Sequence, residues 1–158
     1  MTRLIPWAFL ALVACGDDGG MPAAAGTGDG GGGTGGSAGA DCLDPLPERC
    51  DLAFAATYDA IYENLLGRTC GSSSTGTSCH GPDGGMAGLF LHDREMAYDY
   101  LLGHVDDSAR VVPGDPECSM LVRRIESTDP DFFMPPTSRL SDGERCAIER
   151  WIAMGAKR

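Results

Sequence analysis

Basic residues are scarce in this sequence. Its 158 residues include 12 lysines and arginines against 23 aspartates and glutamates, which gives a formal net charge of −11. Proteins that bind nucleic acid, or that adhere electrostatically to anionic lipid, need clustered positive charge. The composition therefore argues against a nucleic-acid partner and against direct adhesion to anionic lipid, whereas a basic protein partner is compatible with it.

Strand patterns and the common catalytic motifs are also lacking. No run alternates Val, Ile or Thr with polar residues, so no β-sheet is expected. The sequence contains no Ser-His-Asp elbow, P-loop, dinucleotide fingerprint or HExxH motif, and no internal repeat is visible. We therefore expect an all-α protein that is not an enzyme.

Residues 1–15, MTRLIPWAFLALVAC, have the layout of a secretory signal. An arginine precedes an apolar run that is too short for a stable membrane-spanning helix and ends in small residues. The final LVAC resembles the lipobox of bacterial lipoproteins, which implies cleavage before Cys15 and a lipid on its thiol; the alternative is an ordinary secretory signal that ends in cysteine. We expect an exported protein, periplasmic or associated with the outer membrane, that contacts the membrane through a lipid anchor only.

Glycine dominates residues 16–40, which hold 12 of the 23 glycines of the chain. No aromatic or β-branched aliphatic residue occurs there, so this segment cannot bury enough surface to offset the entropy of ordering it. We expect a disordered, flexible linker, rich in Gly, Ala and Ser, with a mean span on the order of 25–30 Å. The folded domain is then expected over residues 41–158.

Four helices are expected in this domain. Apolar residues recur at helical spacing in the first of them, and turn residues separate the others. Gly67 and Gly103 are expected to end the first two helices, Asp93 to cap the second, and Ser141 with Glu144 to form a capping box for the last. The predicted architecture is about four short helices with long ordered loops, at residues 52–66, 93–103, 119–126 and 141–156.

Six cysteines follow Cys15, at positions 42, 50, 70, 79, 118 and 146. An even number of cysteines in an exported protein favours disulfides, because the compartment is oxidising. Local spacing suggests that Cys42 pairs with Cys50 around a proline-containing loop, and that Cys118 pairs with Cys146 between two helices. These four cysteines are the disulfide candidates.

The stretch CGSSSTGTSCHG, residues 70–81, ends in a cysteine followed at once by a histidine. Cys79 and His80 match the second half of C-x-x-C-H, the attachment signal for c-type haem. Eight residues rather than two separate Cys70 from Cys79. This spacing leaves open haem attached through both sulfurs, haem attached through Cys79 only, or a Cys70–Cys79 disulfide. A zinc site is disfavoured, because no second ligand pair at zinc spacing is found.

Further stretches follow in a fixed order. CHGPDGGMAGLFL is followed by VVPGDPECSMLVRRI, by MPP at Met134–Pro136, and by LSDGERCAIERWIAMGA at the end of the chain. This ordered set resembles the planctomycete-type cytochrome c domain over roughly Tyr58 to Ala156. The resemblance implies a class I-like cytochrome c fold that binds haem c, with His80 as the proximal and Met134 as the distal iron ligand. It also matches Cys70 and Cys79 to the thioether cysteines, although only Cys79 has the expected spacing to the histidine.

The residues around Met134 agree with this role. Two prolines follow Met134 and hold its thioether in a stiff, extended loop. A methionine and histidine pair raises the potential of haem iron and suits electron transfer. Phe132, Phe133 and Trp151 are candidate walls of the pocket. His92 and His104 are expected at the surface, and packing roles are expected for Met86, Met96, Met120 and Met154.

The sequence therefore predicts a lipid-anchored, haem-binding electron carrier. It would exchange single electrons with a redox protein partner that the sequence does not identify, and a monomer is expected. The alternative is a haem-free, disulfide-stapled module of the same fold with a binding or structural role in the cell envelope.

Overall fold

The structure is a computed structural model, and it describes residues 42–47, 50–72 and 79–158. Within these ranges the secondary structure is helical, with no β-strand, so the all-α prediction is confirmed. The expected signal, Cys15, the linker and residues 73–78 lie outside the described residues. The helical elements are α1 (Tyr58–Ile61), the π-helix η1 (Tyr62–Cys70), the 3₁₀ turn η2 (Met86–Gly88), α2 (Arg94–Leu101), α3 (Met120–Glu126) and α4 (Asp142–Ala153).

The first helical segment differs from the prediction at both ends. It begins at Tyr58 rather than at Leu52, because the Thr57 side chain accepts a hydrogen bond from the Ala60 N–H and caps the first turn. It also continues past Gly67, which was expected to end it, and reaches Cys70 as a π-helix. The extra length delivers Cys70 to the end of the helix.

The other helix ends agree with the capping signals in the sequence. At α2, the Asp93 side chain accepts a hydrogen bond of 2.9 Å from the Met96 N–H, and Gly103 follows the helix with a φ of 76°. At α4, Ser141 and Glu144 form the expected capping box. These local signals predicted the positions of two helices to within a few residues.

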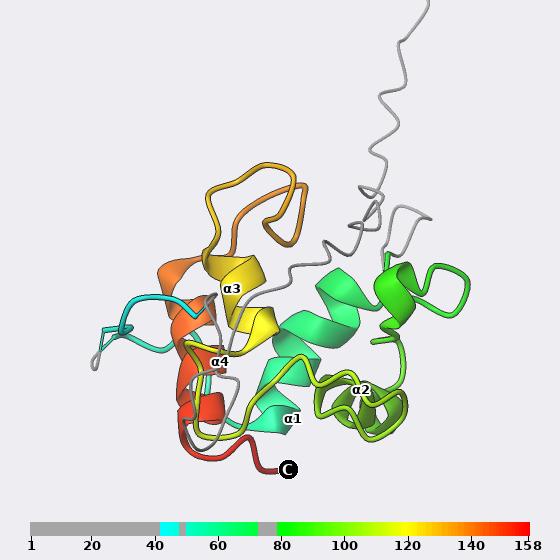
Figure 1. Ribbon diagram of the computed structural model, residues 1–158, viewed down its shortest axis with the longest axis horizontal. Helices are drawn as coiled ribbons and strands as arrows, with labels where there is room; N and C mark the ends of the chain where they lie inside the picture. Colours follow the sequence, from blue (N-terminus) through cyan, green and yellow to red (C-terminus); the bar gives the residue numbers. More distant parts are fainter. Residues whose placement is uncertain (1–41, 48–49, 73–78) are drawn as a thin grey trace, which may run out of the picture.

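One apolar core lies between α1, η1, α2, α3 and α4. Helix α4 packs against both α3 and α1 (Figure 1). Fifteen apolar side chains are buried in it, and burying a large aliphatic or aromatic side chain contributes about 1.5–3 kcal/mol. They are Tyr58, Ile61, Leu65, Leu66, Leu91, Ala97, Leu101, Val111, Val122, Ile125, Leu140, Ile148, Trp151, Ile152 and Ala156.

Trp151 holds the end of the chain against this core. Its indole packs on the Tyr58 ring with centroids 5.6 Å apart, and its Nε1–H donates a hydrogen bond of 2.7 Å to the Lys157 carbonyl. The Tyr98 hydroxyl donates to the carbonyl of the buried Ala156. Trp151 is therefore a structural residue and lies outside the cavity described below, contrary to its expected role as a pocket wall.

The stretch VVPGDPECS forms a hydrogen-bonded turn that starts α3. Pro113 and Gly114 occupy its corner, and Gly114 has a φ of 86°, as the third residue of a type II turn requires. The buried Ser119 hydroxyl accepts from the Val112 N–H at 2.9 Å and donates to the Asp115 carbonyl at 2.8 Å. The motif thus fixes where α3 begins.

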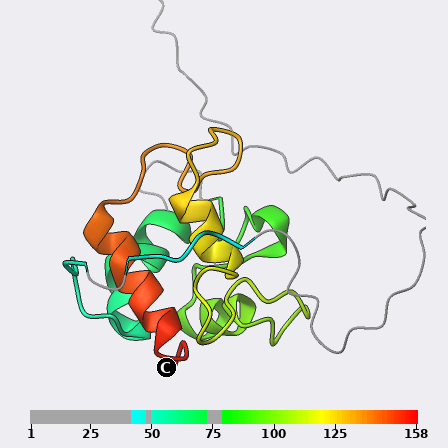
Figure 2. The ribbon, with the colours of Figure 1, turned by 60° about the vertical axis from the view of Figure 1, so that its left-hand side comes forward.

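The disulfide pairing predicted from local spacing is wrong. Cys42 is bonded to Cys118, and Cys50 is bonded to Cys146, with sequence separations of 76 and 96 residues. The reason is that residues 42–47 do not close a local loop but lie across the α3–α4 pair (Figure 2). There the Leu43 N–H donates to the Glu117 carbonyl at 3.0 Å, which places Cys42 beside Cys118, just before α3. Cys50 is bonded to Cys146, which lies in α4.

No helix in the described part of the chain is both long enough and apolar enough to cross a membrane.

Candidate functional site

A cavity of about 310 Å³ opens between η1, the segment 79–91, α3 and the MPP loop. Its size is at the lower end of the range for small-molecule and cofactor sites. All four residues predicted to bind a cofactor line it, namely Cys70, Cys79, His80 and Met134. Most of the other lining side chains are apolar: Leu65, Leu66, Met86, Ala87, Leu89, Leu91, Leu101, Met120, Leu121, Ile125, Pro135, Pro136, Leu140 and Ile148.

Backbone hydrogen bonds hold His80 in the wall of this cavity. The His80 N–H donates to the Cys70 carbonyl at 3.2 Å, and the Leu91 N–H donates to the His80 carbonyl at 2.7 Å. The first of these bonds closes the loop between the two cysteines, so eight intervening residues still return the chain to the end of η1. Cys70 and His80 therefore lie side by side although they are ten positions apart.

The His80 side chain is oriented by the Leu89 carbonyl, which lies 3.2 Å from Nδ1. Because a carbonyl oxygen only accepts, Nδ1 carries the proton and Nε2 keeps its lone pair. Burial lowers the pKa of His80 below its ordinary value of 6.5, and the positive charges of Arg110 and Arg124 act in the same direction. His80 is therefore a neutral imidazole at neutral pH, which is the form that binds metals.

Cys70 lies at the junction of η1 and the segment that carries His80. Burial raises the pKa of its thiol to about 12, so it is protonated at neutral pH. The next residue, Gly71, is packed so closely that a Cβ there would lie 2.1 Å from the Leu91 carbonyl oxygen. Only glycine allows the end of η1 to approach this segment so closely.

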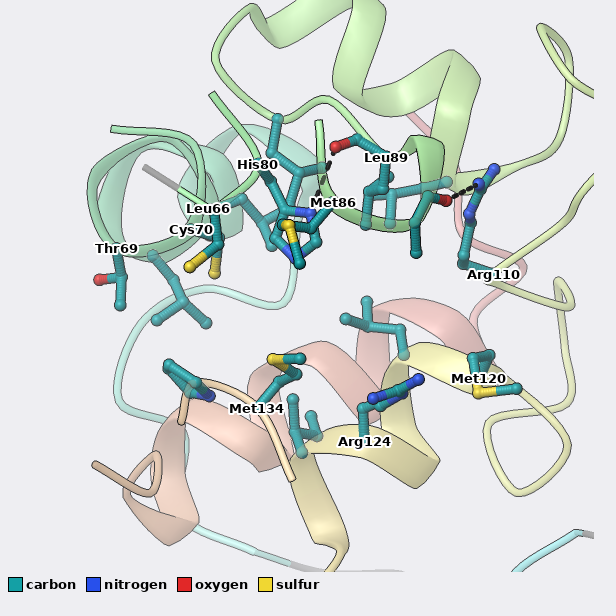
Figure 3. A pocket seen from close by; sticks show the side chains of 18 of the residues that line it. Leu66, Thr69, Cys70, His80, Met86, Leu89, Arg110, Met120, Arg124 and Met134 are labelled. Carbon is teal, nitrogen blue, oxygen red and sulfur yellow. Dashed lines mark hydrogen bonds between the residues drawn. The ribbon is translucent and has the colours of Figure 1, made fainter. Parts of the chain in front are cut away.

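Met134 lies on the wall of the cavity opposite His80 (Figure 3). Its N–H donates a hydrogen bond of 3.0 Å to the carbonyl of Arg124 on α3, and the Met134–Pro135 peptide bond is cis. Pro135 and Pro136 line the cavity beside it. The loop thus presents the Met134 thioether from a position held by α3.

Figure 3 shows how these side chains face one another. His80 and Met134 lie on opposite walls of the cavity, and Cys70 lies towards one end of it. Arg110 and Arg124 lie on the other side of the line between His80 and Met134. The cavity therefore has a thiol end and a cationic end, with one nitrogen and one thioether ligand facing each other between them.

Some predicted roles around the site are wrong. Phe132, Phe133 and Trp151, the candidate walls, are absent from the cavity lining. Met86 and Met120, expected to be packing residues, line it, whereas Met96 and Met154 are exposed. His104 is exposed as expected, but His92 is partly buried, and neither histidine lines the cavity.

Sequence reasoning missed the two arginines of the cavity. Arg110 directly precedes the VVPGDP turn, and Arg124 is the arginine that closes the stretch S-x-L-x-x-R from Ser119. Their positions in these two motifs could have drawn attention to them. The linear sequence does not show, however, that both side chains line the same cavity. In the described part of the chain, no group of three or more His, Cys, Asp or Glu side chains could hold a metal ion.

The domain is helical, and its largely apolar cavity is lined by two cysteines and by a histidine that faces a methionine (Figure 3). The family model of planctomycete cytochrome C matches residues 77–138, which supports a planctomycete-type cytochrome c domain. The matched residues include Cys79, His80, Arg110, Arg124 and Met134. A domain of this kind suggests an electron carrier rather than an enzyme. No curated protein and no solved structure matches the chain.

Proposed function

We propose that this protein binds haem c in the cavity and transfers single electrons. The observation that carries the proposal is that His80 and Met134, recognised separately in the sequence, lie on opposite walls of one largely apolar cavity that both candidate thioether cysteines also line. A flat iron macrocycle with two axial ligands and two thioether bonds needs this arrangement of donors.

The chemistry of the donor set fits haem. Haem, when bound, supplies iron that alternates between the ferrous and ferric states. His80 presents the Nε2 lone pair, because its Nδ1–H is engaged with the Leu89 carbonyl. Met134 contributes a soft thioether that favours the ferrous state and so raises the potential. The largely apolar walls would give both ligands a non-polar environment.

The expanded cysteine spacing is compatible with attachment at two points. The hydrogen bond from the His80 N–H to the Cys70 carbonyl brings the two ends of the loop together. Cys70 and Cys79 both line the cavity as a result. We therefore favour thioether bonds to both cysteines over attachment through Cys79 alone.

We also propose that a lipid on Cys15 and the glycine-rich residues 16–40 tether the domain to the cell envelope. The lipobox-like LVAC and the composition of the linker support this. The domain would then act as an exported monomer, periplasmic or at the outer membrane, that reaches a redox protein partner. Metabolic labelling with a radioactive fatty acid tests the tether: we expect label on the wild-type protein and none on Cys15→Ser.

A haem-free envelope module is the second candidate. Two long-range disulfides, Cys42–Cys118 and Cys50–Cys146, stabilise the fold without a cofactor. The C-x₈-C-H spacing also departs from the short motif that haem attachment normally requires. This candidate predicts a colourless protein that folds fully on its own.

The experiment that separates the two is the visible spectrum of the full-length protein from cells that mature c-type cytochromes, followed by a pyridine haemochrome assay. We expect a Soret band, sharp α and β bands on reduction, and a haemochrome that reports two thioether bonds. A colourless protein, from cells that mature a control cytochrome, supports the haem-free module and contradicts the proposal.

Three methionines line the cavity, which provides matched controls for the distal ligand. Met134→Ala is expected to change the Soret and α bands and to lower the midpoint potential by about 0.1 V or more, because iron loses its thioether ligand. Met86→Ala and Met120→Ala remove the same side chain from other parts of the wall. They are expected to leave the ligation spectrum unchanged, and a larger effect of either variant than of Met134→Ala contradicts the assignment.

A further inference from the structure

Arg110 and Arg124 are the only permanently charged side chains that line the cavity in the described part of the chain. Among the residues that the structure describes, no aspartate or glutamate lines it, although the chain as a whole has a formal net charge of −11. A carboxylate that enters an apolar cavity is costly unless a cation pairs with it. The lining therefore favours a ligand that is apolar over most of its surface and acidic at one edge.

We propose that Arg110 and Arg124 bind the two propionate carboxylates of haem and so hold the propionate edge of the macrocycle at their end of the cavity. This inference rests on the function proposed above. Haem carries its propionates and its vinyl groups on different parts of its rim, and the vinyl groups are the ones that react with cysteine. Cys70 lies on one side of the His80–Met134 line, and both arginines lie on the other (Figure 3). The cavity thus offers a cysteine where the vinyl groups would lie and positive charge where the propionates would lie.

The Arg110 guanidinium is held in place before any ligand binds. One of its nitrogens donates to the Tyr100 and Ser108 carbonyls and to the Asp106 carboxylate, at 3.1, 2.7 and 2.7 Å. The other terminal nitrogen reaches the Ala87 carbonyl at 3.3 Å. The side chain is only 14% exposed, so its position is determined by the fold. A preorganised guanidinium loses little entropy when it binds a carboxylate.

Arg124 connects the same end of the cavity to the methionine loop. Its guanidinium stacks over the Phe132 ring, with 4.2 Å from Cζ to the ring centroid, and donates to the Phe132 carbonyl at 3.3 Å. Its own carbonyl accepts from the Met134 N–H. Through these contacts, a carboxylate held by Arg124 would lie next to the loop that carries the distal ligand.

One backbone hydrogen bond fixes the position of Arg110 relative to α3, the helix that carries Arg124. The N–H of Leu121, in the first turn of α3, donates a hydrogen bond of 2.9 Å to the Arg110 carbonyl. The turn between Val112 and Ser119 therefore returns the chain to Arg110 and starts the helix that carries Arg124. This explains why Arg110, directly before the VVPGDP turn, and Arg124, in the helix that follows the turn, reach the same cavity.

Haemin and its dimethyl ester test the proposal, because they differ only at the two carboxyl groups, which are negatively charged in haemin and neutral methyl esters in the other compound. The full chain carrying Cys15→Ser, produced without haem attachment and with its disulfides oxidised, is titrated with each compound and followed at the Soret band. We expect haemin to bind about tenfold or more tightly than the ester, as charge-assisted hydrogen bonds to guanidinium predict. The Arg110→Gln, Arg124→Gln double variant is expected to bind both compounds with the affinity of the ester.

Arg123→Gln is the matched control, since it removes the same charge from the neighbouring position of α3, outside the cavity lining. We expect it to keep the preference for haemin, with all variants checked for folding by circular dichroism. Equal affinity of the unsubstituted chain for haemin and ester overturns the carboxylate assignment while leaving haem binding intact, and this comparison needs no arginine variant. A folded chain that binds neither compound contradicts the proposed function itself, and the assignment with it.

Discussion

The backbone N–H of Met134 donates a hydrogen bond of 3.0 Å to the backbone carbonyl of Arg124. This bond ties the loop that carries the candidate distal ligand to the end of α3. The Arg124 guanidinium meanwhile stacks on Phe132, two positions before Met134. Arg124 thus positions Met134, the candidate iron ligand, through its carbonyl, and its guanidinium is itself a candidate partner for a carboxylate. The shape of the cavity therefore depends on where α3 lies.

Ser119 fixes the start of α3 through two hydrogen bonds, and replacing it is expected to lower the stability of the domain. Ser119→Ala leaves the buried Val112 N–H and the Asp115 carbonyl without their hydroxyl partner. We expect the free energy of unfolding to fall by about 1–3 kcal/mol, measured by guanidinium chloride denaturation of the haem-free protein. Ser108→Ala, in an exposed loop, is the control and is expected to change it by less than about 0.5 kcal/mol. Equal effects of the two variants contradict this role.

The Cys42–Cys118 and Cys50–Cys146 disulfides are expected to stabilise the domain. Peptide mapping under non-reducing conditions should recover Cys42 linked to Cys118 and Cys50 linked to Cys146. Because each bond closes a long loop, replacing both cysteines of either pair by serine should lower the free energy of unfolding by about 2–5 kcal/mol. Peptides that link Cys42 to Cys50 contradict the observed arrangement of the N-terminal segment.

Gly71 is expected to be essential for the shape of the cavity. In Gly71→Ala the new methyl group would lie 2.1 Å from the Leu91 carbonyl oxygen, which forces this segment away from η1. We expect a loss of about 1–3 kcal/mol in the free energy of unfolding, together with reduced haem uptake, because the neighbouring Leu89 carbonyl orients His80.

Gly114→Ala provides the comparison for that variant. Nothing lies within 4 Å of a Cβ at Gly114, but its φ of 86° disfavours alanine. This substitution is therefore expected to cost about 1 kcal/mol through the backbone alone and to leave haem uptake intact. If Gly71→Ala binds haem as well as Gly114→Ala does, the close approach at Gly71 is not required for the site.

Glu149 on α4 is expected to make stability depend on pH. Burial, followed by the hydrogen bond and the charge of Glu126, raises the pKa of Glu149 from 4.5 to about 7. Between these values the folded state binds more protons than the unfolded state, so stability falls as the pH rises from 4.5 to 7. Glu149→Gln should reduce this fall by on the order of 1–2 kcal/mol, seen in melting curves at pH 5, 6 and 8. The exposed Glu95→Gln serves as control, and parallel curves for Glu149→Gln and wild type contradict the prediction.

The sequence predicted those features that depend on neighbouring residues. Asp93 and Ser141 cap helices where expected, because the hydrogen bonds of a cap stay within one turn. His80 and Met134 were identified from their motifs, and the structure places both in the cavity.

Features that depend on distant parts of the chain were missed or wrong. The pairing of Cys42 follows from the path of residues 42–47 across α3 and α4, which no local spacing encodes. Gly67 does not end its helix, since tertiary packing overrides a weak local preference. The Arg110 guanidinium is held at the cavity by contacts with its own loop, at Asp106 and Ser108, and with two more distant positions, Tyr100 and Ala87.

X-ray absorption at the iron edge of the purified full-length protein tests the central claim most directly. If haem lies between His80 and Met134, the spectrum shows five nitrogen neighbours and one sulfur neighbour around iron, and the sulfur is lost in Met134→Ala. Six nitrogen or oxygen neighbours without sulfur contradict the assignment of Met134. A protein that contains no iron, from cells that mature a control cytochrome, contradicts haem binding altogether.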